Sequence, residues 1–371
     1  MSAHTWKKKF LAGVTAACIG ATSTFAMMPV PASEASSSVL GNVIAAGVSA
    51  AAARSQAKSY VKYYNSTEQG RQELFAAFQK KYGVNNDAAL NSRLKSIMGN
   101  LSSGIAAVDP SIDDKPYLYF VNNDESFNAF CSLGHVMSVN TGMFHMLNRD
   151  DEIAVVLGHE MGHGQKDHTA KGIMKEINKK ATAQMLVSAA GGGAVASVVG
   201  SLALNQSIAH STKDQEWEAD NLSFDYISHS GYNPGAAAAV WQRVIDTQGN
   251  NAQSKAASFF NPSDHPNNAA RRDNYEKRLY AFSGNHVHVA NGTVIVNKKP
   301  FVTPAPAAGM SGAERSYFVQ GNLAAAYHNG HSKNAARAEN GTVYLGAQAI
   351  ITPVDGDESA EVLAARLNEI K

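Results

Sequence analysis

The chain has 371 residues, of which 44% are hydrophobic and 17% charged, and its formal net charge is +1 at pH 7. This length and composition are enough for a sizeable core and predict two domains. A net charge this close to zero does not indicate a nucleic-acid partner, because such partners usually require a strongly basic surface.

The N-terminal residues have the organisation of a secretory signal peptide. A basic start, MSAHTWKKK, precedes the apolar stretch FLAGVTAACIGA, and Thr24-Phe25-Ala26 forms a small-residue cleavage site. The apolar stretch is too short for a good membrane span, although an uncleaved anchor is the alternative. We therefore expect residues 1–26 to be removed and the protein to be exported, to the periplasm or to the cell exterior.

Cleavage at this site would leave Cys131 as the only cysteine, because Cys18 lies inside the signal. No internal disulfide is then possible, even in an oxidising compartment. Residues 15–18 loosely resemble a lipoprotein site, but Thr15 stands where a large aliphatic residue is expected. We therefore do not expect a lipid anchor.

Residues 27–58 are predicted to be a linker followed by an Ala-rich helix. Further along, residues 117–122 (YLYFVN) and 135–140 (HVMSVN) have the composition of strands. We expect them to flank the segment around Asn128 in a small sheet whose edge could pair with an extended peptide. Core packing would require the same strands, so both uses remain open.

The pentapeptide HEMGH places two histidines and a glutamate on one helical turn. His159 and His163 lie on one face, since a helix has about 3.6 residues per turn, and both imidazoles can reach one zinc ion. Glu160 lies about 100° around the helix, where it can act as a general base beside the metal. The preceding NRDDEIAVVLG predicts a buried helix. Two core histidines with satisfied hydrogen bonds are the alternative.

Residues 186–204 form a stretch of small residues that is long enough to cross a bilayer. It consists of Gly, Ala and Ser rather than Leu and Ile, so we expect small helices that pack over a cleft or touch the membrane surface. Its glycines, Gly191 to Gly193 and Gly200, could allow the segment to move as a lid.

A third zinc ligand is expected downstream, because catalytic zinc usually has three protein ligands and one open position. The helical pattern of residues 214–227 places Glu216 and Asp220 one turn apart on a common face. Glu216 would bind zinc, and Asp220 would accept the outer ring N–H of a zinc histidine. Glu218 lies about 200° from Glu216 and is expected to face solvent. A solvated acidic face would have the same spacing.

Residues 290–304 and 339–353 are an internal repeat with an offset of 49 residues. Both copies open on Asn-Gly between β-rich runs, which predicts a hairpin turn, and an acidic, Ala-rich helical pattern follows each. We expect residues 284–371 to form a small two-repeat β/α domain. Nothing in it carries chemistry, so we expect it to bind a partner protein, to self-associate or to cover the preceding domain.

HExxH followed by ExxAD, here Glu216-Trp217-Glu218-Ala219-Asp220, resembles the gluzincin peptidases grouped around HtpX, BepA and the CAAX prenyl endopeptidase. Three further segments resemble this family and follow in its order: Asn128-Ala129-Phe130 with Gly134, Gly231-Tyr232-Asn233-Pro234, and His265-Pro266 with Arg271. The resemblance covers roughly residues 60 to 280. The chain departs from the family pattern at the cleft edge and before the third ligand: Leu133, His135 and Thr212-Lys213.

The resemblance implies a zinc endopeptidase that acts on proteins, and it assigns roles to several residues. Zinc would be held by His159, His163 and Glu216, Glu160 would be the catalytic base, and the substrate would lie along Asn128, Ala129 and Phe130. His265 would lie near the metal, where it could polarise the scissile carbonyl or occupy the open position as a latch. A plain turn residue before Pro266 is the alternative.

We therefore expect an α+β fold with a mainly helical zincin-type metallopeptidase domain and a small sheet at residues 59–283, followed by the repeat domain at 284–371. The expected function is an exported zinc metalloendopeptidase with one Zn²⁺ per subunit. The family's link to envelope quality control suggests misassembled or membrane-associated protein substrates. The alternative is a chaperone-like or assembly factor with a latent zinc site, in which the repeats bind the partner.

Overall fold

The computed structural model describes residues 49–191, 194–204, 212–248 and 267–371, so the expected signal peptide lies outside the described residues. The helices of the described part are, in chain order, α3 (Ala50–Ser66), α4 (Glu68–Tyr82), α5 (Ala88–Ala106), α6 (Thr141–Met146), α7 (Asp150–Gln165), α8 (His168–Ile177), α9 (Lys180–Gly191), α10 (Val195–Ala203), α11 (Lys213–Ser228), α12 (Ala236–Gln248), α13 (Asn268–Phe282), α14 (Gly312–His328) and α15 (Ala360–Ile370). Short 3-10 helices are η2 (Pro110–Asp113), η3 (Leu133–His135) and η5 (His331–Lys333).

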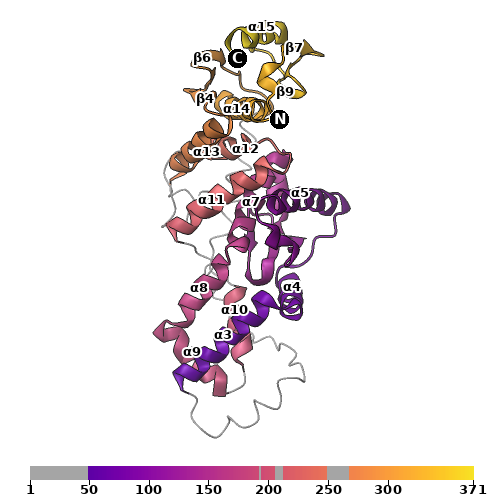
Figure 1. Ribbon diagram of the computed structural model, residues 1–371. Helices are drawn as coiled ribbons and strands as arrows, with labels where there is room; N and C mark the ends of the chain where they lie inside the picture. Colours follow the sequence, from indigo (N-terminus) through magenta and orange to yellow (C-terminus); the bar gives the residue numbers. More distant parts are fainter. Residues whose placement is uncertain (1–48, 192–193, 205–211, 249–266) are drawn as a thin grey trace.

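In the described residues, the strands form three small sheets, with β1 (Leu118–Asn122), β2 (Ala129–Cys131) and β3 (Val136–Asn140) in the first, β4 (Val287–Ala290), β5 (Thr293–Val296) and β6 (Lys299–Val302) in the second, and β7 (Ala336–Glu339), β8 (Thr342–Leu345) and β9 (Gln348–Ile351) in the third. The molecule is elongated, with α15 at one end and α3, α8, α9 and α10 at the other (Figure 1). The mainly helical α+β fold with small sheets confirms the expected fold class.

The central helices α7 and α11 pack unusually close together. A side chain at Gly162 would place its Cβ 3.2 Å from the backbone of Ala219, and one at Gly158 would lie 3.1 Å from the Ser223 hydroxyl. Ser223 also donates a hydrogen bond of 2.8 Å from its hydroxyl to the carbonyl of Val155. Because two of the α7 positions that face α11 are glycines, the helix that carries the third expected ligand lies directly against the HEMGH helix.

The two expected strands and the segment after Asn128 form one small sheet with the strand order β1-β3-β2, so this segment lies at the edge of the sheet and not between the other two strands. β1 pairs with β3 in parallel, and the short η3 turn brings β3 back antiparallel to β2. The segment after Asn128 is therefore an edge strand. No strand in the described part of the chain pairs with its outer side.

The small-residue stretch at 186–204 contributes to α9 and α10, which pack against α3 in a cluster that includes Ala53, Ala57, Leu186, Val195 and Val199. In the described ranges, no helix combines the length and the apolar character that a bilayer span requires. Gly200 has open space at its Cβ position, whereas Gly192 and Gly193 lie outside the described residues. A lid function of this segment stays a prediction.

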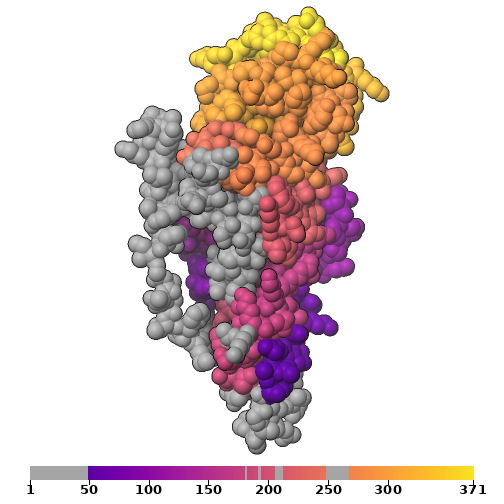
Figure 2. Space-filling model, turned by 90° about the vertical axis from the view of Figure 1, so that its left-hand side faces the viewer, coloured from indigo at the N-terminus to yellow at the C-terminus, as the bar shows by residue number. Residues whose placement is uncertain are grey.

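The C-terminal repeats each form a three-stranded antiparallel meander followed by a helix. Both Asn-Gly pairs adopt the left-handed backbone that a type I′ hairpin requires, with φ of 49° and 76° at Asn291 and Gly292, and 49° and 74° at Asn340 and Gly341. The hairpins expected from the sequence are confirmed. The space-filling view shows the repeats stacked on one end of the central region (Figure 2).

Helix α14 belongs to two cores at once. Its residues Tyr317 and Phe318 pack in the central cluster, whereas Val319 and Leu323 pack in the cluster of the repeats. Two buried ion pairs join the same regions: Arg243 of α12 lies 2.6 Å from Glu152 of α7 and 2.6 Å from Glu314 of α14. The repeats therefore share a helix and a charge group with the region that carries HEMGH.

Candidate active site

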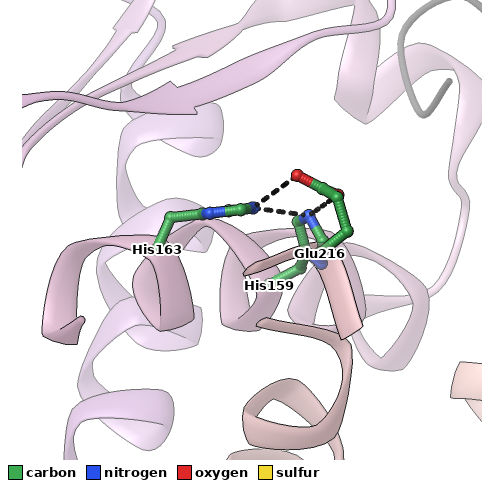
Figure 3. A group of neighbouring side chains, drawn as sticks. All are labelled: His159, His163 and Glu216. Carbon is green, nitrogen blue, oxygen red and sulfur yellow. Dashed lines mark hydrogen bonds and ion pairs between the residues drawn. The ribbon is translucent and has the colours of Figure 1, made fainter. Parts of the chain in front are cut away.

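Three buried ligand atoms converge between α7 and α11 (Figure 3). His159 Nε2 and His163 Nε2 are 3.0 Å apart, and each lies 3.3 Å from an oxygen of Glu216. This group of two nitrogens and one carboxylate has the composition of a catalytic metal site with three protein ligands.

The start of α11 determines where Glu216 stands on the helix. Thr212 caps the helix: its hydroxyl accepts the backbone N–H of Gln215, and the Gln215 side chain accepts the N–H of Thr212. Glu216 therefore lies in the first turn of the helix, on the face that meets α7, and its side chain is 3% exposed.

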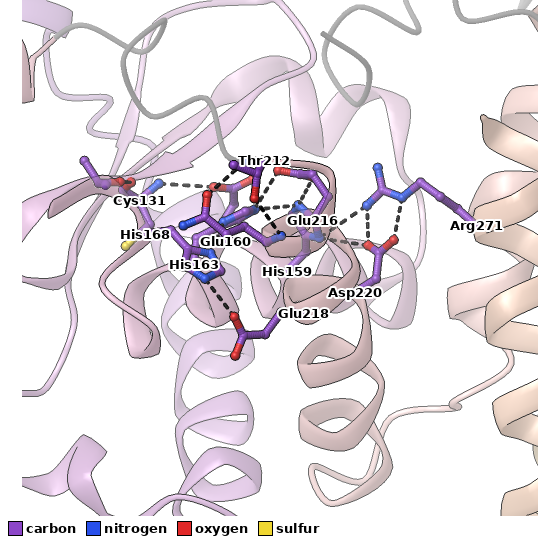
Figure 4. Close-up of polar contacts among 12 residues, drawn as sticks. Cys131, His159, Glu160, His163, His168, Thr212, Glu216, Glu218, Asp220 and Arg271 are labelled. Atoms are coloured by element: carbon purple, nitrogen blue, oxygen red, sulfur yellow. Dashed lines mark hydrogen bonds and ion pairs between the residues drawn. The ribbon is translucent and has the colours of Figure 1, made fainter. Parts of the chain in front are cut away.

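Asp220, one turn after Glu216, orients the first histidine (Figure 4). Its carboxylate lies 2.9 Å from His159 Nδ1 and also accepts hydrogen bonds from Arg271 Nε at 2.6 Å and the Tyr275 hydroxyl at 3.0 Å. Although burial alone would raise the pKa of Asp220, Arg271 and His159 hold that pKa below its ordinary value. The carboxylate therefore accepts the Nδ1–H of His159, so that in the neutral ring the lone pair of Nε2 points into the ligand group.

The second histidine has a different neighbour. His163 Nδ1 lies 2.8 Å from Nδ1 of His168, and His168 Nε2 lies 3.0 Å from an oxygen of Glu218 (Figure 4). Burial and the neighbouring His163 lower the pKa of His168 to about 4, so its imidazole is neutral at neutral pH. A buried histidine and an acidic side chain thus stand behind His163.

The surroundings of the ligand group favour a positive charge. Burial alone would lower the pKa of His159, but its hydrogen bonds with Asp220 and Glu216 raise it to about 10. A site that holds a proton this firmly is one in which the carboxylates outweigh the cost of desolvation. A divalent cation would satisfy the same charge requirement.

Glu160 lies beside the ligand group without joining it (Figure 4). One of its carboxylate oxygens accepts the backbone N–H of Cys131 at 3.2 Å, which ties the HEMGH helix to the edge strand β2. Burial raises the pKa of Glu160 above its ordinary value. A carboxylate with a raised pKa next to a metal site is suited to accept and release a proton.

The structure brings together most of the expected site residues. His159, His163 and Glu216 form the ligand group, with Glu160 and Asp220 at the expected places. Of the expected substrate segment, Asn128 accepts the Asn140 N–H through its carbonyl, and the side chains of Ala129 and Phe130 are buried. This strand therefore presents its backbone rather than its side chains at the sheet edge.

His265 lies outside the described residues. The sequence did not indicate the contacts of Cys131 and Tyr275 with the site. Glu218 was expected to face solvent, and its side chain is 45% exposed, yet its carboxylate contacts His168. The spacing of residues along α11 could not indicate this contact, because His168 is the first residue of another helix, α8.

Comparison with known proteins shows which family the chain belongs to. Residues 88–279, more than half of the chain, match the model of peptidase family M48. The metalloprotease LoiP of Escherichia coli (strain K12) is 28% identical over 183 residues, which are 47% of this chain and 68% of that protein. Metalloprotease YcaL of the same organism is 28% identical over 176 residues, 47% of this chain and 66% of YcaL.

The beta-barrel assembly-enhancing protease of Yersinia pestis is 28% identical over 162 residues, which are 41% of this chain but only 33% of that protein. The chain thus spans about a third of this relative and about two thirds of the two shorter ones. The matched residues include the ligand group and Glu160. The chain therefore belongs to peptidase family M48 and is a metalloendopeptidase.

Proposed function

We propose that the protein is an exported zinc endopeptidase that cleaves protein substrates, with His159, His163 and Glu216 as zinc ligands. The observation that carries this proposal is the convergence of three buried ligand atoms next to Glu160. Two imidazoles and a carboxylate are a common ligand set of catalytic zinc. The donation of His159 Nδ1–H to Asp220 supports the fit, because it leaves Nε2 free to coordinate.

Bound zinc would act as a Lewis acid and make an attacking water more acidic. Glu160 would take the proton of that water and transfer it to the leaving amine. The Cys131 N–H at 3.2 Å holds the Glu160 carboxylate on the side of the edge strand. An extended substrate that adds to β2 would pass this carboxylate, with main-chain hydrogen bonds providing affinity.

The expected signal peptide and the family relationship support a location in the cell envelope. Several relatives are named beta-barrel assembly-enhancing protease. Because of this name, we propose misassembled envelope proteins as the substrate class. Contacts of residues 186–204 with the membrane surface and of residues 284–371 with a partner protein or a second copy belong to the same proposal. His265 stays a proposed latch or electrophile.

The proposal is tested by measuring metal content and casein hydrolysis on the same purified protein. We expect about one zinc per chain and hydrolysis that a chelator abolishes and added zinc restores. The alternative, a chaperone-like or assembly factor with a latent site, would bind zinc without cleaving casein. Protein that binds no zinc at all would contradict the metal assignment itself.

A further inference from the structure

We propose that His168 and Glu218 are positioning residues that determine which nitrogen of His163 carries its proton. They act through a hydrogen-bonded chain that runs from Glu218 through His168 to His163. The inference rests on the proposed function, because it concerns His163 as a metal ligand. It gives a role to the two polar neighbours of the ligand group that the proposed reaction does not use.

The direction of each hydrogen bond follows from the donors available. A carboxylate can only accept, so the 3.0 Å contact with Glu218 requires the proton of His168 to be on Nε2. A neutral imidazole has one N–H, so His168 Nδ1 then has only a lone pair. The 2.8 Å contact between the two Nδ1 atoms therefore requires His163 Nδ1 to be the donor. His163 Nε2 is left with its lone pair, facing Glu216.

The opposite direction of the hydrogen bond between His163 and His168 would prevent His163 from binding a metal. If His168 donated from Nδ1, the proton of neutral His163 would move to Nε2 and point at His159 Nε2, which is 3.0 Å away. A protonated Nε2 cannot coordinate a metal. The negative charge of Glu218 thus selects the tautomer of His163 that can act as a ligand, although Glu218 does not touch His163 in the structure.

Helix α11 serves both histidines of the metal site in this arrangement. Asp220 accepts directly from His159, whereas Glu218 reaches His163 through a second imidazole. The ligand Glu216 comes from the same helix. One short segment, EWEAD, therefore supplies a ligand and the acceptors that orient the other two.

Glu218 is a better residue to mutate than His168, because its side chain is far less buried. The side chain of His168 is 1% exposed, so its removal would leave a cavity next to His163. The side chain of Glu218 is 45% exposed, so Glu218→Ala leaves no cavity and should fold like the wild type. A change in metal affinity of this variant would then report on the hydrogen-bonded chain.

We expect Glu218→Ala to weaken zinc binding by roughly 10-fold or more, measured on the metal-free protein by competition with a chelating dye. Glu218→Gln should retain part of the affinity, because an amide oxygen can still accept the Nε2–H of His168. Asp214→Ala is the matched control, since it removes an exposed acidic residue of the same helix. The melting temperature of the metal-free protein should be the same in all three.

A double-mutant cycle tests the path through His168. In His168→Gln, the amide oxygen can accept the Nδ1–H of His163 without help from Glu218. Adding Glu218→Ala to this variant should then have no further effect on zinc affinity. Equal effects of Glu218→Ala in both backgrounds would overturn the inference, and so would wild-type affinity of the Glu218→Ala single variant. Wild-type protein without zinc would instead overturn the proposed function.

Discussion

Glu160 is the residue on which the proposed chemistry depends most directly. It lies beside the ligand group and is held by the Cys131 N–H, but it is not one of the three proposed ligands. Glu160→Gln keeps the size of the side chain and removes its ability to take a proton. We expect this variant to retain zinc and to lose on the order of 10²-fold or more in kcat/KM toward a peptide. Loss of zinc from the variant would show that Glu160 is a ligand instead.

The protonation of His159 predicts a pH dependence of metal binding. Its pKa of about 10 in the metal-free site means that the ring carries an extra proton at neutral pH, and a zinc ion that binds there would have to displace it. Fewer competing protons are present at higher pH, so the apparent zinc affinity should rise with pH. We expect about a tenfold rise per pH unit for one released proton between pH 6 and 8. Chelator competition across this range checks the slope, and a flat profile would contradict it.

The convergence of the three proposed ligands was predictable from the sequence, because the position of each side chain depends on the periodicity of a single helix. The spacing of His159 and His163 and of Glu216 and Asp220 follows from helical periodicity alone. His168 was not predictable in this way. Asp167 adopts a left-handed backbone, with φ of 51°, and ends the HEMGH helix, so His168 begins a new one. The turn brings its ring next to His163, where a continued helix would have placed it on another face.

Three helices meet at the buried charge group of Arg243, Glu152 and Glu314. Arg243→Met would leave two buried carboxylates without their cation, which should cost about 3 to 5 kcal/mol of stability. Thermal unfolding measures this loss. Arg337→Met is the matched control, because its ion pair with Glu339 is about half exposed and should be worth less than about 1 kcal/mol. Similar melting temperatures of the two variants would mean that the buried group does not hold α7 in place.

Several helices and strands were predictable from local sequence patterns, but the elements that they pack against or pair with were not. The hairpins of the repeats follow from Asn-Gly at positions that need a positive φ, a local property of Asn291-Gly292 and Asn340-Gly341. The place of β2 at the sheet edge depends on how β1 and β3 pair, which no local pattern encodes. Likewise, the apolar residues of α14 indicate a buried helix without indicating that Phe318 and Leu323 face different cores.

The shared helix predicts the behaviour of a truncated chain. A separate repeat domain, as expected from the sequence, would allow a chain that ends near Gly284 to fold and bind zinc. The structure leads us to expect the opposite, because that chain would lose Tyr317 and Phe318 from the central core and Glu314 from Arg243. Solubility, circular dichroism and zinc content of the truncated chain test this against the full chain. A soluble, zinc-binding product would show that the central region is complete without α14.

A basic surface at one end of the molecule is relevant to the proposed membrane contact. Helices α3 and α8 lie side by side, joined near their ends by Arg54 with the Asn178 carbonyl and by Asn65 with Asp167. Exposed lysines on these two helices are Lys58, Lys62, Lys171 and Lys175. The neighbouring α9 presents Met185, which is 58% exposed. A basic surface with an apolar side chain is suited to an anionic bilayer.

We expect the protein to sediment with vesicles that contain anionic phosphatidylglycerol at low salt, and to bind less in the triple variant Lys58→Gln, Lys171→Gln, Lys175→Gln. The matched control removes the same charge from the C-terminal repeats, whose helix α15 lies at the other end of the molecule (Figure 1). It carries Lys298→Gln, Lys299→Gln and Lys333→Gln, which replace exposed lysines. Equal binding of both variants would place the contact elsewhere. No binding to anionic vesicles would exclude this surface.

The position of α14 in the chain also affects when the enzyme can become active. A chain that is synthesised or exported N-terminus first presents HEMGH and EWEAD long before α14 emerges. Until then, Glu152 and Arg243 lack their third partner and the central core lacks Tyr317 and Phe318. The nascent peptidase would therefore stay immature while it is still in contact with the ribosome or the export channel. Maturation would then depend on the arrival of the repeats.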